Sequence, residues 1–75
     1  MSLMKMHTLS LGQWATVDSV EDSPLRAHLR QLGFERGERV CRIYTDSSAF
    51  LSAYRVENTL IALRKNDAAS VLVRL

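Results

Sequence analysis

The sequence predicts a small, mainly β domain, either a barrel or a sandwich, that carries one short helix. Three observations favour this class: five short apolar segments follow at close spacing, no long helical pattern occurs, and one helix-like segment interrupts the strands. The chain has 75 residues, so residues 1–75 are expected to form a single domain. Hydrophobic residues at 47% and charged residues at 24% are typical of a globular chain.

The first predicted strand lies between Leu9 and Val20. Gly12 indicates a turn at its start, and the residues then alternate so that Ala15 and Val17 point inward. Residues 1–8 are expected to be disordered or a remnant of cloning, and no function is assigned to them.

A short helix is predicted between Ser23 and Gly33. The Ser23 hydroxyl is suited to cap the helix, Pro24 to occupy its first position, and Gly33 to adopt a positive φ at its end. Three leucines at i, i+4 and i+7 share one face: Leu25, Leu29 and Leu32. A helix of about nine residues is not stable alone, so these leucines must pack on the strands and close one end of the barrel.

Four more strands are expected in the second half of the chain: 40–44, 49–56, 59–64 and 70–75. In the first of these, Val40 and Ile43 fall on opposite faces, so a β-bulge is expected. Asn58 is expected to adopt the left-handed conformation of a tight hairpin. The polar segment 65–70 is expected to form one loose helical turn.

Several short motifs, in their order and spacing, resemble the ferrous iron transport protein A (FeoA) family. The match comprises Leu32, Gly33 and Phe34, then Gly37, and finally the segment from Ala62 to Lys65 followed by Asp67 and Ala68. The resemblance covers nearly the whole chain from about Leu9. It implies a five-stranded SH3-like barrel with one short helix inserted after the first strand.

The resemblance also implies a function: a small cytoplasmic, non-enzymatic accessory of bacterial ferrous iron transport. Its implied partner is the membrane transporter FeoB, which carries a GTP-hydrolysing domain. The resemblance further implies a part in iron homeostasis and an association with transition metal ion binding. The family's usual Pro-Leu-Gly-Asp-Pro type loop is replaced here by TDSSAF (residues 45–50), so partner contacts are expected to differ at this loop. The alternative is a small SH3-like barrel that binds nucleic acid or another protein.

Composition disfavours most other kinds of chemistry. The net charge of +2 is low for a nucleic-acid binder, and no apolar run approaches the length of a membrane span, so neither nucleic-acid binding nor membrane insertion is expected. His7, His28 and Cys41 lie at no metal-ligand spacing, and no phosphate loop or catalytic grouping occurs. We therefore expect no enzyme activity, no cofactor and no metal site in the monomer.

Two sets of side chains remain as candidates for partner binding. Arginines are concentrated in the helix and the strand after it, where Arg26 and Arg30 point away from the leucine face. Exposed aromatic residues of SH3-like barrels commonly bind peptides, which makes Tyr44, Phe50 and Tyr54 the other candidates. The alternative for the arginines is an ordinary solvated face balanced by nearby acidic residues. An apolar face left over by a small barrel can also produce a homo-oligomer.

Overall fold

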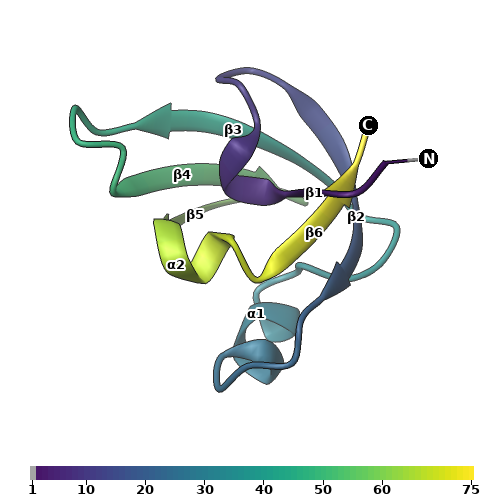
Figure 1. Cartoon of the computed structure of the whole chain (residues 1–75). Helices are drawn as coiled ribbons and strands as arrows, with labels where there is room; N and C mark the ends of the chain where they lie inside the picture. Colours follow the sequence, from purple (N-terminus) through teal and green to yellow (C-terminus); the bar gives the residue numbers. More distant parts are fainter. Residues whose placement is uncertain (1) are drawn as a thin grey trace.

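The computed structural model describes residues 2–75, which form six strands, two short α-helices and one 3₁₀ helix (Figure 1). All strand pairs are antiparallel, and the strands form one sheet in the order β1-β6-β2-β3-β4-β5. The elements in chain order are β1 (Met4–Lys5), η1 (Met6–Thr8), β2 (Trp14–Val20), α1 (Arg26–Gln31), β3 (Arg39–Thr45), β4 (Leu51–Val56), β5 (Thr59–Arg64), α2 (Lys65–Ala68) and β6 (Val71–Arg74).

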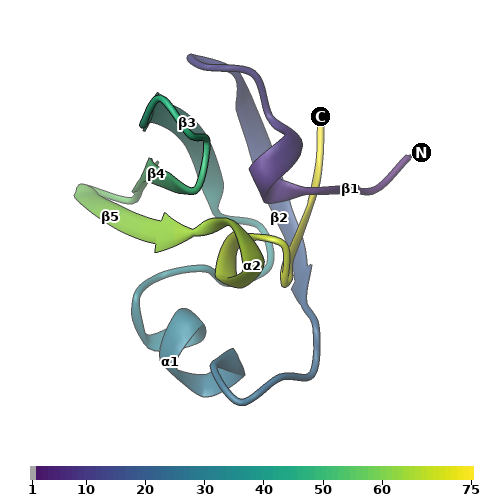
Figure 2. The same cartoon turned by 60° about the vertical axis from the view of Figure 1, so that its left-hand side comes forward.

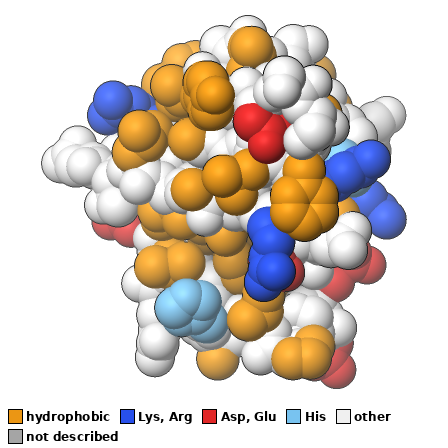
Figure 3. All heavy atoms as spheres, turned by 90° about the vertical axis from the view of Figure 1, so that its left-hand side faces the viewer, with side chains coloured by type: hydrophobic (Ala, Val, Ile, Leu, Met, Phe, Trp, Pro, Cys, Tyr) orange, Lys and Arg blue, Asp and Glu red, His pale blue; other side chains and the backbone are white. Residues whose placement is uncertain are grey.

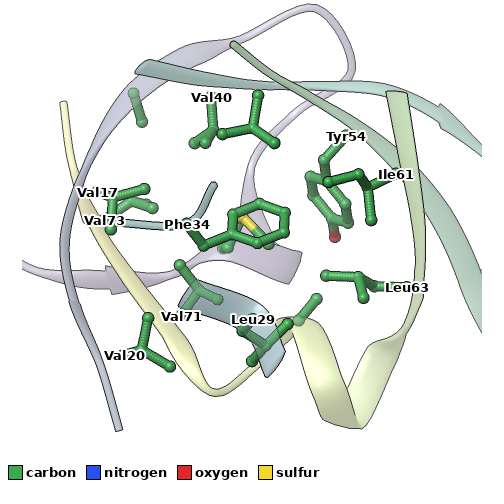
Figure 4. Packing of buried hydrophobic residues seen from close by; sticks show 14 of the residues in the cluster. Val17, Val20, Leu29, Phe34, Val40, Tyr54, Ile61, Leu63, Val71 and Val73 are labelled. Atoms are coloured by element: carbon green, nitrogen blue, oxygen red, sulfur yellow. The ribbon is translucent and has the colours of Figure 1, made fainter. Parts of the chain in front are cut away.

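The sheet curls around one apolar core, to which β2, β3, β4, β5 and β6 all contribute (Figure 4). The predicted inward positions of β2 are confirmed, because Ala15 is 2% exposed and Val17 is fully buried. The curled sheet is not closed, since β1 and β5 lie at the two ends of the strand order.

The N-terminal segment is the main departure from the predicted fold. Met4 pairs with Val73 and Lys5 pairs with Leu72, which adds β1 as a sixth strand to the five that were expected. Met6 in η1 and the following Leu9 are fully buried. The expectation of disorder is therefore wrong for Met4–Thr8, because burial of these apolar side chains anchors the segment; Met1 lies outside the described residues.

Helix α1 covers one end of the curled sheet (Figure 2). As predicted, its leucines face the core: Leu29 is fully buried, and Leu25 and Leu32 pack against the core while partly exposed. The helix begins at Arg26 rather than at Pro24. The Ser23 hydroxyl does not cap it, since Ser23 accepts the Arg26 N–H through its backbone carbonyl at 3.1 Å.

The turns follow the sequence pattern with one exception. The predicted bulge lies between Arg42 and Tyr44, where the register of β3 against β4 shifts. The predicted helical turn is present as α2, and Gly33 has the predicted positive φ of 114°. In the β4–β5 hairpin, however, Glu57 rather than Asn58 has the positive φ, at 54°. Val56 pairs with Thr59, so Glu57 and Asn58 are the two central residues of the hairpin. A positive φ at the first central residue alone is the pattern of a type II′ turn, whereas the expectation had placed it at the second.

Candidate interaction surface

The outer surface of strands β3, β4 and β5 carries an apolar patch. Side chains alternate along β4 and β5, so that Ser52, Tyr54 and Val56 are buried while Leu51 and Arg55 are exposed. We call the outward apolar set the β3–β5 face and define it by Tyr44, Leu51, Ala53, Leu60 and Ala62. Hydrophobic side chains gather on the side of the molecule that carries the β3–β4 hairpin, with few charged groups among them (Figure 3).

The strand register explains how this face is assembled. Ala53 lies opposite Tyr44 on one side and Ala62 on the other, which makes an apolar row across the three strands. The small alanine side chains leave Tyr44 and Leu60 prominent, at 59% and 57% exposed. Directly opposed side chains on a sheet lie about 5 Å apart, so these residues form one continuous surface.

Arginines border this face on the same side of the sheet. Arg64 lies opposite Leu51, and Arg55 lies opposite Leu60. Arg64 also forms an exposed ion pair with Asp67, 3.6 Å from Nε to the carboxylate. An apolar centre with an arginine border is the composition found at many protein interfaces.

The structure does not bring the five predicted partner-binding residues together. Tyr54 is fully buried, because the alternation of β4 directs it into the core; the prediction that it is exposed is wrong. Phe50 is 54% exposed and directly precedes β4. It is two residues before the buried Ser52, so by alternation it lies on the opposite side of the sheet from Tyr44, which pairs with the outward Ala53. Of the predicted aromatic residues, only Tyr44 belongs to the β3–β5 face.

The two predicted helix arginines lie in α1, away from the tip of the β3–β4 hairpin (Figure 1). Arg26 is partly exposed and its Nε atom is buried without a hydrogen-bond partner, whereas Arg30 is exposed. Arg30 lines an open groove of about 450 Å³, together with Asp18, Ser19, Val20, Phe34, Glu35 and Arg36. Two arginines and two carboxylates border this groove, so it has no concentrated positive charge for a nucleic-acid backbone.

The divergent loop TDSSAF is held by hydrogen bonds to one carboxylate. Asp46 Oδ1 accepts bonds from the Ser48 hydroxyl at 3.1 Å, the Phe50 N–H at 2.9 Å and the Leu51 N–H at 3.4 Å. Desolvation alone would raise the pKa of Asp46. The bonds from Leu51, Ser48 and Phe50, together with one from the backbone of Ala49, outweigh this effect and lower the pKa. The loop therefore has a defined conformation at neutral pH, with Ala49 at a φ of 61°.

Arg42 has a structural role that sequence reasoning missed. Its guanidinium donates to the carbonyl of Leu9 at 2.9 Å, to Ser52 Oγ at 3.0 Å and to Thr45 Oγ1 at 3.2 Å. These bonds connect the N-terminal segment with β3 and β4. A long-range hydrogen bond to a main-chain carbonyl leaves no local pattern in the sequence, so only the structure reveals it.

His7 lies in η1, in a positively charged neighbourhood. Burial is the main factor that lowers the pKa of His7, and the nearby cations Lys65, Lys5 and Arg42 lower it further. Its Nδ1 atom is buried and has no hydrogen-bond partner in the part of the chain that the structure describes. The imidazole is therefore favoured in its neutral form.

The described part of the chain holds no group of three or more His, Cys, Asp or Glu side chains arranged for a metal ion. Cys41 is buried in β3, His28 is exposed on α1, and His7 is partly exposed in η1. No helix within residues 2–75 is long and apolar enough to cross a membrane.

Comparison with known proteins identifies relatives with this architecture. FeoA of Stenotrophomonas maltophilia, a prokaryotic SH3 domain protein solved as a zinc complex, is 32% identical; the match covers 93% of this chain and 88% of that chain, with a TM-score of 0.85. FeoA of Chlorobium tepidum is 27% identical over 96% of this chain and 70% of that chain, with a TM-score of 0.88.

A manganese-dependent transcriptional repressor shares the fold alone, at 14% identity over 96% of this chain and 41% of its own, with a TM-score of 0.85. The comparison with curated proteins finds no match. The sequence model of the FeoA domain matches residues 4–75. Since the match includes β1 and runs to the last residue, this chain belongs to the FeoA domain family and has its SH3-like fold.

Proposed function

We propose that this protein is a cytoplasmic accessory of bacterial ferrous iron transport that binds a cytoplasmic region of the FeoB-type membrane transporter. FeoA family membership supports the process. The Stenotrophomonas maltophilia relative is described as a candidate ferrous iron transport activating factor, which supports a transporter as the partner. The protein acts by binding and not by catalysis.

The β3–β5 face is the surface that we assign to this binding, and its exposure is the observation that carries the proposal. Tyr44, Leu51 and Leu60 are 59%, 39% and 57% exposed on neighbouring strands. Exposed apolar patches of soluble domains commonly mark protein contacts, and aromatic and arginine side chains supply much of the binding energy. Arg55 and Arg64 border the face and can pair with acidic groups of the partner.

A pull-down from the native cell tests the proposal. Tagged wild-type protein should recover the ferrous iron transporter, and the double variant Tyr44→Lys, Leu51→Lys should not. Phe50→Lys is the matched control, because Phe50 is similarly exposed at 54% but lies outside the β3–β5 face. Folding of each variant is checked by its amide NMR spectrum.

Recovery of no transporter by the wild type would refute the partner. Equal recovery by the wild type and the double variant would refute the assigned surface. Nucleic-acid binding is the competing function, and a gel-shift assay at two salt concentrations reveals it, because phosphate-driven affinity falls steeply as salt rises.

A further inference from the structure

Strand β5 is an unprotected edge of the sheet. It lies last in the strand order and pairs only with β4, in a continuous register from Leu51 opposite Arg64 to Val56 opposite Thr59. Its sequence, TLIALR, contains no proline and carries a charge only at its last residue. Natural edge strands are usually protected by charges, prolines or bulges, and β5 has none of these before Arg64.

The register shows which backbone groups of β5 point away from β4. The Lys65 N–H donates to the Phe50 carbonyl at 2.8 Å, and this pair continues the β4–β5 register beyond the strand. Hydrogen-bonded pairs alternate in an antiparallel ladder, so Ile61 and Leu63 bond to β4 while the N–H and C=O of Leu60 and Ala62 point toward the free edge. Within residues 2–75, no turn, loop or side-chain hydrogen bond is made to these groups of Leu60 and Ala62.

The charges at the two ends of β5 are complementary to a second copy of the same strand. Glu57 precedes the strand and Lys65 follows it, and both side chains are exposed. Arg64, the last residue of the strand, already pairs with Asp67. Antiparallel pairing of two copies places Glu57 of each copy opposite Lys65 of the other. Parallel pairing would place like charges side by side, which is unfavourable.

From this geometry we infer that two copies of the chain pair through their β5 strands, antiparallel and about a two-fold axis. With the axis at Ile61, Leu60 of one copy lies opposite Ala62 of the other, and the free N–H and C=O groups of both residues are satisfied. A two-fold axis perpendicular to the sheet keeps the outward side chains on one side. The two β3–β5 faces then join into one continuous surface.

The dimer is weak, because its contact is small. Stable interfaces bury about 800 Å² on each partner, and one six-residue strand edge offers less than this. The protein is therefore monomeric when dilute and dimeric when concentrated. This inference does not depend on the proposed transporter partner.

Sedimentation velocity from low micromolar to millimolar protein tests the inference, combined with NMR amide exchange. The sedimentation coefficient should rise with concentration toward that of a dimer. Amide exchange of Leu60 and Ala62 should slow in parallel, while the amides of Ile61 and Leu63, already bonded to β4, should not respond.

Three variants locate the contact. Ala62→Pro removes an outward N–H without removing a bond to β4, and Leu60→Lys adds a charge to the edge; both should abolish the dimer. Leu11→Lys is the matched control, because Leu11 is 56% exposed in the loop before β2 and should leave the dimer intact. Glu57→Lys should weaken the dimer, and adding Lys65→Glu should restore it.

A protein that stays monomeric at millimolar concentration overturns the inference. A dimer that Leu60→Lys leaves unchanged also overturns it. The same holds if the amides that become protected as the concentration rises all lie outside β5. If Ala62→Pro fails to fold, Leu60→Lys and the charge exchange still decide the outcome. A monomeric protein that recovers the transporter would overturn this inference alone, and a dimer that recovers none would overturn the proposed function alone.

Discussion

Replacing Tyr54 separates the contribution of its aromatic ring from that of its hydroxyl. The side chain extends from β4 and is fully buried in the core, beside Ile61 (Figure 4). Among residues 2–75 its buried hydroxyl has no partner at hydrogen-bond geometry; burial raises the pKa of this phenol, while the neighbouring Ser52 hydroxyl and Arg42 lower it. The ring therefore stabilises the fold, whereas the hydroxyl has lost its hydration without full compensation.

The two substitutions at this position should act in opposite directions. Tyr54→Ala removes a buried ring and should lower the free energy of unfolding by about 3–5 kcal/mol, the range for large aromatic truncations. Tyr54→Phe keeps the ring and removes only the unpaired hydroxyl, whose burial costs about 1–3 kcal/mol, so stability should be unchanged or higher by up to that amount.

Urea denaturation of the wild type and both variants, followed by circular dichroism, measures these free energies. Tyr44→Ala is the matched control, because Tyr44 is 59% exposed and its truncation should cost well under 1 kcal/mol. A loss of more than 1 kcal/mol for Tyr54→Phe would show that the hydroxyl makes a stabilising bond, for example to Ser52, and would refute the reasoning.

Three further predictions concern α1, pH and metal. Leu29→Ala should cost about 2–5 kcal/mol in urea denaturation, because Leu29 is fully buried; a loss under about half of 1 kcal/mol would show that α1 is not held by this side chain. The pKa of His7 is lowered from 6.5 in the folded state, so its contribution to stability is complete above pH 6.5 and is lost as the pH falls below that value. His7→Gln should flatten the loss of stability between neutral and mildly acidic pH, and an unchanged pH profile would contradict this assignment. Anaerobic titration calorimetry should detect no stoichiometric Fe²⁺ or Zn²⁺ site of micromolar affinity in the monomer, and such a site would overturn the expectation from ligand spacing.

Sequence reasoning succeeded where the pattern is local and failed where a choice depends on distant parts of the chain. The leucine spacing of α1 predicted its buried face. The bulge in β3 was predicted because Val40 and Ile43 would fall on opposite faces of a regular strand. For β4, both sets of alternate positions contain apolar residues. Only the curvature of the sheet determines that Tyr54 points inward and Leu51 outward.

The N-terminal strand illustrates a second limit. β1 is two residues long, too short for any periodicity, and it depends on pairing with β6 at the other end of the chain. The Arg42 bonds to Leu9 and Ser52 are similarly long-range. The candidate surface was therefore predicted only in kind, as aromatic residues on strands with arginines at the border. The arginines that were named, Arg26 and Arg30, lie on α1 and not on this surface. Of the apolar residues of the surface, only Tyr44 was named in advance as partner-binding.

Direct binding of the purified protein to the purified cytoplasmic region of the ferrous iron transporter tests the central claim. Titration calorimetry should show saturable binding by the wild type. Tyr44→Lys should weaken the affinity by about 30-fold, which corresponds to the 2 kcal/mol of a typical hot spot, while Phe50→Lys should leave it unchanged. Absence of binding by the wild type, or equal affinity for Tyr44→Lys and the wild type, would contradict the account.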